Sequence, residues 1–71
     1  MDGNLGDYKG VGEGVMETRI HIGPGYRIYY GREADTILIL LAGGSKRQQD
    51  KDIQTAKERW RVYKQRRRRE R

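Results

Sequence analysis

Four polar side chains at alternating positions, two on either side of a glycine-proline-glycine turn, could together bind an anion and move a proton. Arg19 and His21 precede the turn, and Arg27 and Tyr29 follow it. A guanidinium group donates two parallel hydrogen bonds to a phosphate, and an imidazole exchanges protons near neutral pH. On the residues alone, an ordinary charged surface is the commoner reading of such a set.

The basic charge is concentrated in the last third of the chain, which begins with the pair Lys46 and Arg47. Residues 46–71 hold 12 Lys and Arg against 4 Asp and Glu, a net charge of +8, whereas residues 1–45 hold 4 against 6. Such a basic segment attracts polyanions, most commonly nucleic acid. A solvated helix with a frayed arginine tail explains the charge equally well.

The composition also excludes several kinds of site. The chain has no cysteine and a single histidine, so it can form neither a disulfide framework nor a thiolate zinc site. We therefore expect no metal and no cofactor. No apolar run approaches the roughly 20 residues of a membrane helix, and the glycine-bearing start does not resemble a signal peptide. A cytoplasmic protein without a membrane partner is expected.

The elements that must position the polar side chains are two strands of a hairpin. Apolar and polar residues alternate over residues 15–22 and again over 26–30, which is typical of half-buried strands. A three-residue loop between them would place His21 opposite Arg27 and Arg19 opposite Tyr29. One face would then be cationic and aromatic, and the other apolar, with Tyr26 and Tyr30 in its core.

A third strand and a helix follow. Residues 36–41 are almost entirely apolar, which indicates a strand that needs cover on both faces. Ser45 and Gln48 have the spacing of a capping box, and apolar residues at helical spacing, including Trp60 and Tyr63 as packing residues, predict a helix over 46–65. The prediction is one α+β domain: an irregular lead-in over 1–14, an antiparallel three-stranded sheet within 15–45, a C-terminal helix over 46–65 and a non-helical basic tail over 66–71.

One helix cannot cover both faces of an apolar strand. We therefore expect the second face to meet missing sequence, a partner chain or another copy of this chain, which would form a homo-oligomer.

Three segments in a fixed order resemble one protein family. They are GVGEGVMETRIH (residues 10–21), GPGYRIYY (residues 23–30) and LLAGGSKRQQDKDI (residues 40–53). Together they resemble the phage-derived addiction-module killer proteins, HigB-like toxins of the RelE/ParE superfamily. Members of that family usually carry a strand and two helices before the segment equivalent to residues 4–6. The resemblance therefore implies a truncated RelE-like fold that lacks the N-terminal helices.

The resemblance implies a toxin of a type II toxin-antitoxin system that cleaves mRNA on the ribosome without a metal. Its partners would be a cognate antitoxin, the ribosome and mRNA. In this reading His21, Arg27 and Lys46 are catalytic, with His21 as general acid or base and Arg27 holding the scissile phosphate. Residues that would bind RNA are Arg19, Tyr29, which could stack on a base, and Arg47.

Three alternatives stay open. Arg19 could cover the ring of Tyr29 by a cation–π contact instead of binding RNA. The chain could be a catalytically inactive toxin remnant that binds an antitoxin or RNA, because a small misplacement of catalytic groups abolishes most of the rate. It could also belong to the gyrase-poisoning branch of the superfamily, although the histidine and the basic pair argue against that branch.

Overall fold

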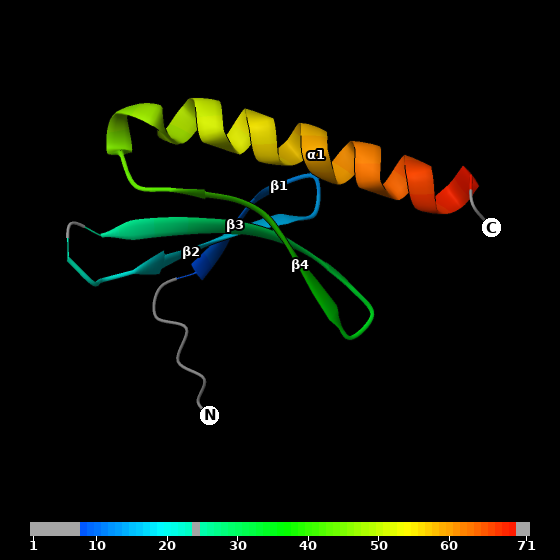
Figure 1. The fold of residues 1–71 in the computed structure, drawn as a ribbon, viewed down its shortest axis with the longest axis horizontal. Helices are drawn as coiled ribbons and strands as arrows, with labels where there is room; N and C mark the ends of the chain where they lie inside the picture. Colours follow the sequence, from blue (N-terminus) through cyan, green and yellow to red (C-terminus); the bar gives the residue numbers. More distant parts are fainter. Residues whose placement is uncertain (1–7, 24, 70–71) are drawn as a thin grey trace.

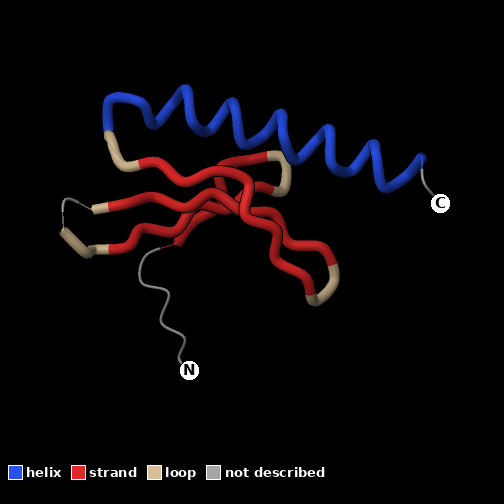
Figure 2. The backbone as a smooth tube through the Cα atoms, viewed as in Figure 1, coloured by secondary structure: helices blue, strands red, loops and turns tan. Residues whose placement is uncertain are grey.

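The computed structural model describes residues 8–23 and 25–69, which form one antiparallel sheet with a helix across one of its faces (Figure 1). The sheet contains β1 (Tyr8–Gly12), β2 (Val15–Ile20), β3 (Tyr26–Glu33) and β4 (Thr36–Gly43), in that spatial order. A 3-10 turn, η1 (Lys46–Gln48), leads into α1 (Gln49–Arg69). Figure 2 shows the strands as one layer and the helix as the second. The expected α+β class is confirmed.

The sheet has four strands, not three, because part of the expected lead-in is a strand. β1 pairs with β2 in antiparallel register, with Tyr8 opposite Thr18. The turn between them has positive φ angles at Gly12 (108°), Glu13 (55°) and Gly14 (83°). Two of these three residues are glycines, which adopt such angles without steric penalty. The prediction of irregular structure was therefore wrong for residues 8–12, while residues 1–7 lie outside the described part of the chain.

The hairpin of β2 and β3 has a longer loop than expected, and its register differs by two residues. Arg19 lies opposite Arg27, and Glu17 lies opposite Tyr29. The loop keeps a turn in which the amide of Gly25 donates to the carbonyl of Ile22 over 3.0 Å. The predicted pairs of His21 with Arg27 and of Arg19 with Tyr29 were wrong. A shift of two residues preserves which side chains share a face, so the division into two faces survives.

A bulge in β4 sends more apolar residues toward the helix than strict alternation would. Tyr29 lies opposite Leu41 and Tyr30 opposite Ile39, so Leu40 has no partner in the ladder. Leu40 is buried, and Leu38 and Leu41 pack against the same core. Ile37 and Ile39 point to the other face and are 53% and 58% exposed. The expectation that this strand is apolar on both faces is confirmed.

The helix packs on the sheet face that we expected to be cationic and aromatic. Val15, Glu17, Tyr29 and Gly31 belong to this face and are buried, and the core forms between them and the helical residues Ala56 and Trp60. Gly31 lies so close to the Trp60 indole that a Cβ atom there would be 2.5 Å from its Cε3 atom. Only the end of this face near the β2–β3 loop stays open.

The opposite sheet face has little cover in the described part of the chain. Tyr8 is 64% exposed there, and Tyr26 is 46% exposed. The prediction that Tyr26 belongs to the core was wrong, whereas Tyr30 is half-buried. The prediction that Trp60 and Tyr63 are packing residues is confirmed, since Trp60 is buried and its ring stacks on that of Tyr63 at 5.5 Å.

The helical segment starts near the expected position but ends later. The side chain of Ser45 caps the 3-10 turn by accepting a hydrogen bond from the amide of Arg47 over 3.1 Å. The helix continues to Arg69, so the prediction of a non-helical tail was wrong for residues 66–69. Arginine is a good helix former, and cations at a helix C-terminus are stabilised by the helix dipole. No helix in the described ranges is long and apolar enough to cross a membrane.

Candidate functional site

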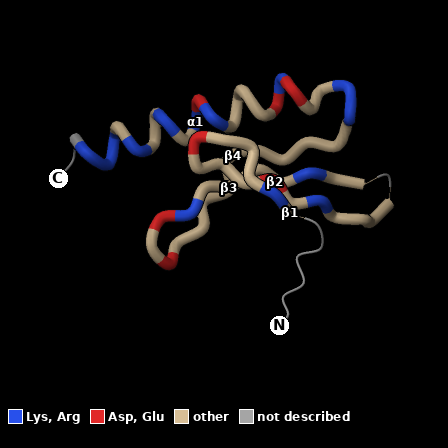
Figure 3. The backbone as a smooth tube through the Cα atoms, turned by 180° about the vertical axis from the view of Figure 1, so that it is seen from behind, with Lys and Arg blue, Asp and Glu red and all other residues tan. Residues whose placement is uncertain are grey.

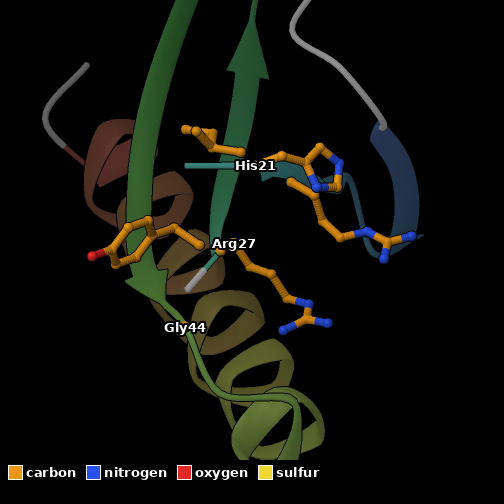
Figure 4. Close-up of a pocket in the computed structure, with 7 residues that line it drawn as sticks. His21, Arg27 and Gly44 are labelled. Atoms are coloured by element: carbon orange, nitrogen blue, oxygen red, sulfur yellow. The ribbon is translucent and has the colours of Figure 1, made fainter. Parts of the chain in front are cut away.

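A hollow of about 190 Å³ lies between the end of β2, the β2–β3 loop, the start of β3 and Gly44, which follows β4 (Figure 4). It is smaller than the roughly 300–1,000 Å³ of pockets that enclose drug-sized ligands. It could therefore take a phosphate or part of a sugar-phosphate, with the rest of a nucleotide outside. Its lining residues are Arg19, Ile20, His21, Gly25, Tyr26, Arg27 and Gly44.

Three of the six predicted site residues line this hollow. Arg27 lies on β3, Arg19 lies near the end of β2, and His21 follows β2 as the first residue of the loop. Figure 4 shows the imidazole of His21 and the guanidinium of Arg27 on the same side of the sheet. An arrangement with the two groups on opposite faces would have excluded a joint role. His21 and Arg19 are exposed, whereas the side chain of Arg27 is only 13% exposed.

A buried carboxylate lies at ion-pair distance from Arg27, without a hydrogen bond to its Nε atom. Glu17 is 2% exposed, and its Oε2 atom lies 4.0 Å from Nε of Arg27. The same oxygen accepts a hydrogen bond from Nε2 of Gln49 over 2.8 Å, and Lys9 approaches Oε1 to 3.9 Å. A buried charge requires such partners because desolvation is costly. Glu17 thus connects β1, β3 and the start of α1 beneath the hollow.

Sequence reasoning did not assign a role to Glu17 or Gln49. The alternation over residues 15–22 does place Glu17 on the same side as Arg19, so the face of Glu17 could be read from the sequence. Its burial could not, because the pattern did not indicate which face the helix would cover. The contact with Gln49 joins residues 32 positions apart and depends on that packing.

Tyr29 cannot stack on a base, because it is fully buried beneath the helix. The prediction of an RNA-stacking role was wrong, and so was the alternative in which Arg19 covers its ring. Burial raises the pKa of the Tyr29 hydroxyl, and the nearby carboxylates of Glu17 and Asp52 raise it further, while Arg27 opposes them. The hydroxyl forms no hydrogen bond of regular geometry in the described part of the structure. It therefore stays neutral and structural.

Lys46 and Arg47 are exposed on η1 and do not line the hollow. They follow Gly44, which does line it, by two and three residues. Figure 3 shows basic residues both at the start of the helical segment and on the hairpin, at the same end of the molecule. Lys46 and Arg47 could thus contact the part of a bound nucleic-acid strand that extends beyond the hollow. Within the described ranges no group of three His, Asp or Glu side chains could hold a metal ion.

Comparisons with known proteins identify one relative. The chain is 51% identical over 55 residues to a Haemophilus influenzae protein whose description is "Uncharacterized protein". The match covers 78% of this chain and 56% of the relative, so the chain spans little more than half of that protein's length. No family model matches the chain, and no solved structure matches it.

Proposed function

We propose that this chain is the toxin component of a type II toxin-antitoxin pair and cleaves mRNA on the ribosome. The observation that supports the proposal best is the hollow, in which His21 and Arg27 lie on the same side of the sheet. The sequence resemblance to HigB-like toxins supplies the reaction class. A cytoplasmic location, a cognate antitoxin, and the ribosome with mRNA as partners belong to the same proposal.

The reaction would be an attack of the ribose 2′-oxygen on the neighbouring phosphorus atom. The 2′-hydroxyl proton passes to a base, the new O2′–P bond forms, and the P–O5′ bond breaks as the 5′-oxygen receives a proton. The products are a 2′,3′-cyclic phosphate and a 5′-hydroxyl. His21 would transfer a proton, and Arg27 would bind the phosphate oxygens as negative charge develops on them.

Three further basic side chains would interact with phosphates of the RNA backbone. Arg19 lines the hollow beside His21, while Lys46 and Arg47 project from η1. Lys46 would add positive charge near the phosphate, and Arg19 and Arg47 would hold neighbouring phosphates. Glu17 is suited to fix the direction of Arg27, because a guanidinium needs a defined orientation to donate two parallel bonds.

The second candidate is a catalytically inactive toxin remnant that binds an antitoxin or RNA. The observation in its favour is the exposed apolar face around Tyr26, Ile37 and Ile39. Such a face needs a partner, and the site could require that partner for its final geometry. The gyrase-poisoning branch is a weaker candidate, because it would leave His21 and the basic pair without a role.

Primer extension on a translated mRNA tests these candidates with the 71-residue chain and with a version extended upstream. Cleavage by both forms supports the enzyme, and cleavage by the longer form alone supports the remnant. Cleavage by neither contradicts the endoribonuclease and favours simple binding or the gyrase branch. Codon-dependent cleavage would appear as new stops within the translated region.

Site variants of the active form test the roles of the residues. His21→Ala should lower the cleavage rate about 10²–10⁴-fold if it transfers a proton. Arg27→Lys keeps a positive charge beside Glu17 but removes the fork that binds two oxygens, so it should lower the rate at least tenfold and leave the fold intact. Lys51→Ala is the control, because Lys51 is exposed on α1 and does not line the hollow. Unchanged rates in both site variants would contradict the assignment.

A further inference from the structure

The second half of α1 forms a dense cluster of positive charge. We call its seven described basic side chains the basic helix end, and Glu58 is the one acidic residue within its span. They occupy about three turns of helix at 3.6 residues per turn. The basic helix end consists of Lys57, Arg59, Arg61, Lys64, Arg66, Arg67 and Arg68.

Few of these charges are neutralised by the protein itself. Arg61 lies 3.3 Å from Glu13, and Arg67 lies 3.8 Å from Glu33. All four side chains are at least 42% exposed, and ion pairs of that kind contribute little. Arg66 and Arg68 have no ion pair within the described ranges. Only three carboxylates, those of Glu13, Glu33 and Glu58, therefore offset the seven positive charges, and a net positive charge remains.

The scaffold holds this cluster in place. Trp60 is buried against Gly31, and Tyr63 stacks on it with an angle of 9° between the ring planes. The Nζ atom of Lys64 lies 5.3 Å from the centre of the Trp60 ring. Because the helix is held at these points, its charged side chains project from a fixed backbone. Fixed charges lose less entropy on binding than those of a disordered tail.

The spacing along the helix creates a row of cations. Arg61, Lys64 and Arg68 are three and four residues apart, so they lie on one side of the helix, over about 10 Å of its length. Phosphates of one strand follow one another about every 3.4 Å along the axis of a duplex, so the row is as long as about three of these steps. On another side of the helix Val62 is 46% exposed, in a cavity of about 470 Å³ whose lining also includes Glu58, Arg59 and Arg66. Three charged residues thus line this cavity, whereas protein interfaces normally have an apolar core depleted of charge.

The basic helix end and the hollow lie at opposite ends of the molecule. The β2–β3 loop and the C-terminus of α1 mark the two ends of the long axis in Figures 1 and 3, and the described molecule is 41 Å long. A nucleic-acid segment bound at the helix would therefore be a different segment from one whose phosphate enters the hollow.

From these observations we infer that the basic helix end is a docking surface for the backbone phosphates of a nucleic-acid duplex. Binding would use charge and shape without reading bases, since guanidinium and ammonium groups on phosphates carry no sequence information. This surface goes beyond the proposed cleavage site, because it would bind a duplex whether or not the hollow cleaves RNA. An RNA duplex and a DNA duplex share the phosphate chemistry.

The test is a fluorescence-anisotropy titration with RNA and DNA duplexes of about 16 base pairs or more. Lys64→Gln/Arg68→Gln removes two charges of the row that have no ion pair within the described ranges, and Arg32→Gln/Lys51→Gln removes two exposed charges elsewhere. Loss of two phosphate contacts should reduce the slope of log affinity against log salt by about 2 and weaken binding on the order of tenfold. Circular dichroism checks that both double variants keep the wild-type fold.

Preserved affinity in Lys64→Gln/Arg68→Gln, or an equal loss in both double variants, would overturn the inference. So would displacement of the duplex by polyglutamate at an equal concentration of negative charge, since the surface would then suit an acidic protein. Tighter binding of the RNA duplex than of the DNA duplex identifies RNA as the source of the phosphates, and the reverse identifies DNA. His21→Ala/Arg27→Lys should retain duplex binding, which separates this inference from the proposed cleavage.

Discussion

Gly31→Ala should destabilise the fold strongly, because the space above Gly31 is filled by the Trp60 indole. An added Cβ atom would lie 2.5 Å from Cε3 and 2.6 Å from Cδ2 of that ring, whereas carbon atoms in contact are about 3.5–4.0 Å apart. The ring would have to move by about 1 Å. Trp60 is only 4% exposed, so that movement disturbs the core.

The magnitude follows from the cost of overpacking. Forcing an extra methyl group into a packed core costs about 1–3 kcal/mol, and the short distances to three ring atoms favour the upper part of that range. A domain of this size has a free energy of unfolding of about 4–10 kcal/mol. With a shift of about 4–8 °C per kcal/mol, the melting temperature should fall by about 10–20 °C.

Thermal and urea unfolding followed by circular dichroism would measure this effect. Gly10→Ala is the matched control, since a Cβ atom at Gly10 would meet only the Met16 sulfur at 3.7 Å, an ordinary contact. In a Trp60→Leu background the Gly31→Ala change should cost about 2 kcal/mol less, as expected for residues in direct contact. Equal stabilities of Gly31→Ala and Gly10→Ala would refute the reasoning.

Three other measurements test the structure. Glu17→Gln should lower the free energy of unfolding by about 2 kcal/mol or more in urea, because Arg27 loses its buried counterion; an unchanged midpoint would show that the ion pair is unimportant. Tyr29→Phe should change stability by less than about 1 kcal/mol at neutral pH. The raised pKa keeps the Tyr29 hydroxyl neutral in the folded state, whereas in the unfolded state the hydroxyl ionises above about pH 10. Wild type should therefore lose stability relative to Tyr29→Phe only above that pH, by at most about 1.4 kcal/mol per pH unit. Sedimentation should show concentration-dependent self-association that Ile37→Thr/Ile39→Thr reduces, and a well-folded monomer of the wild type would contradict it.

The periodicity of the sequence was enough to predict the fold class and the division of each strand into two faces. Alternation over residues 15–22 and 26–30 correctly placed Arg19, Arg27 and Tyr29 on one side. The position of the helix over that side could not be predicted, because one helix and two partly apolar faces leave two arrangements. The error about Tyr29 follows from this ambiguity.

The hairpin register and the first strand were harder to predict for local reasons. The turn signal at Gly23 and Gly25 is compatible with loops of several lengths, and two residues of slippage leave the side-chain pattern unchanged. β1 contains two glycines among its five residues, so its alternation is too weak to distinguish a strand from a loop. The strand conformation of β1 depends instead on its pairing with β2.

The unpaired position in β4 also determines which length changes the strand could accept. If Leu40 were deleted, Ile39 and Leu41 would become neighbours, and their partners Tyr30 and Tyr29 are already neighbours on β3. The pairing of β3 with β4 would then be continuous, and every other side chain of β4 would stay on its present face of the sheet. A deletion at Ile37 would instead reverse the orientation of the residues on one side of it. Residue 40 is thus the position at which β4 could lose one residue while the chain still reaches the start of η1 on the same side of the sheet.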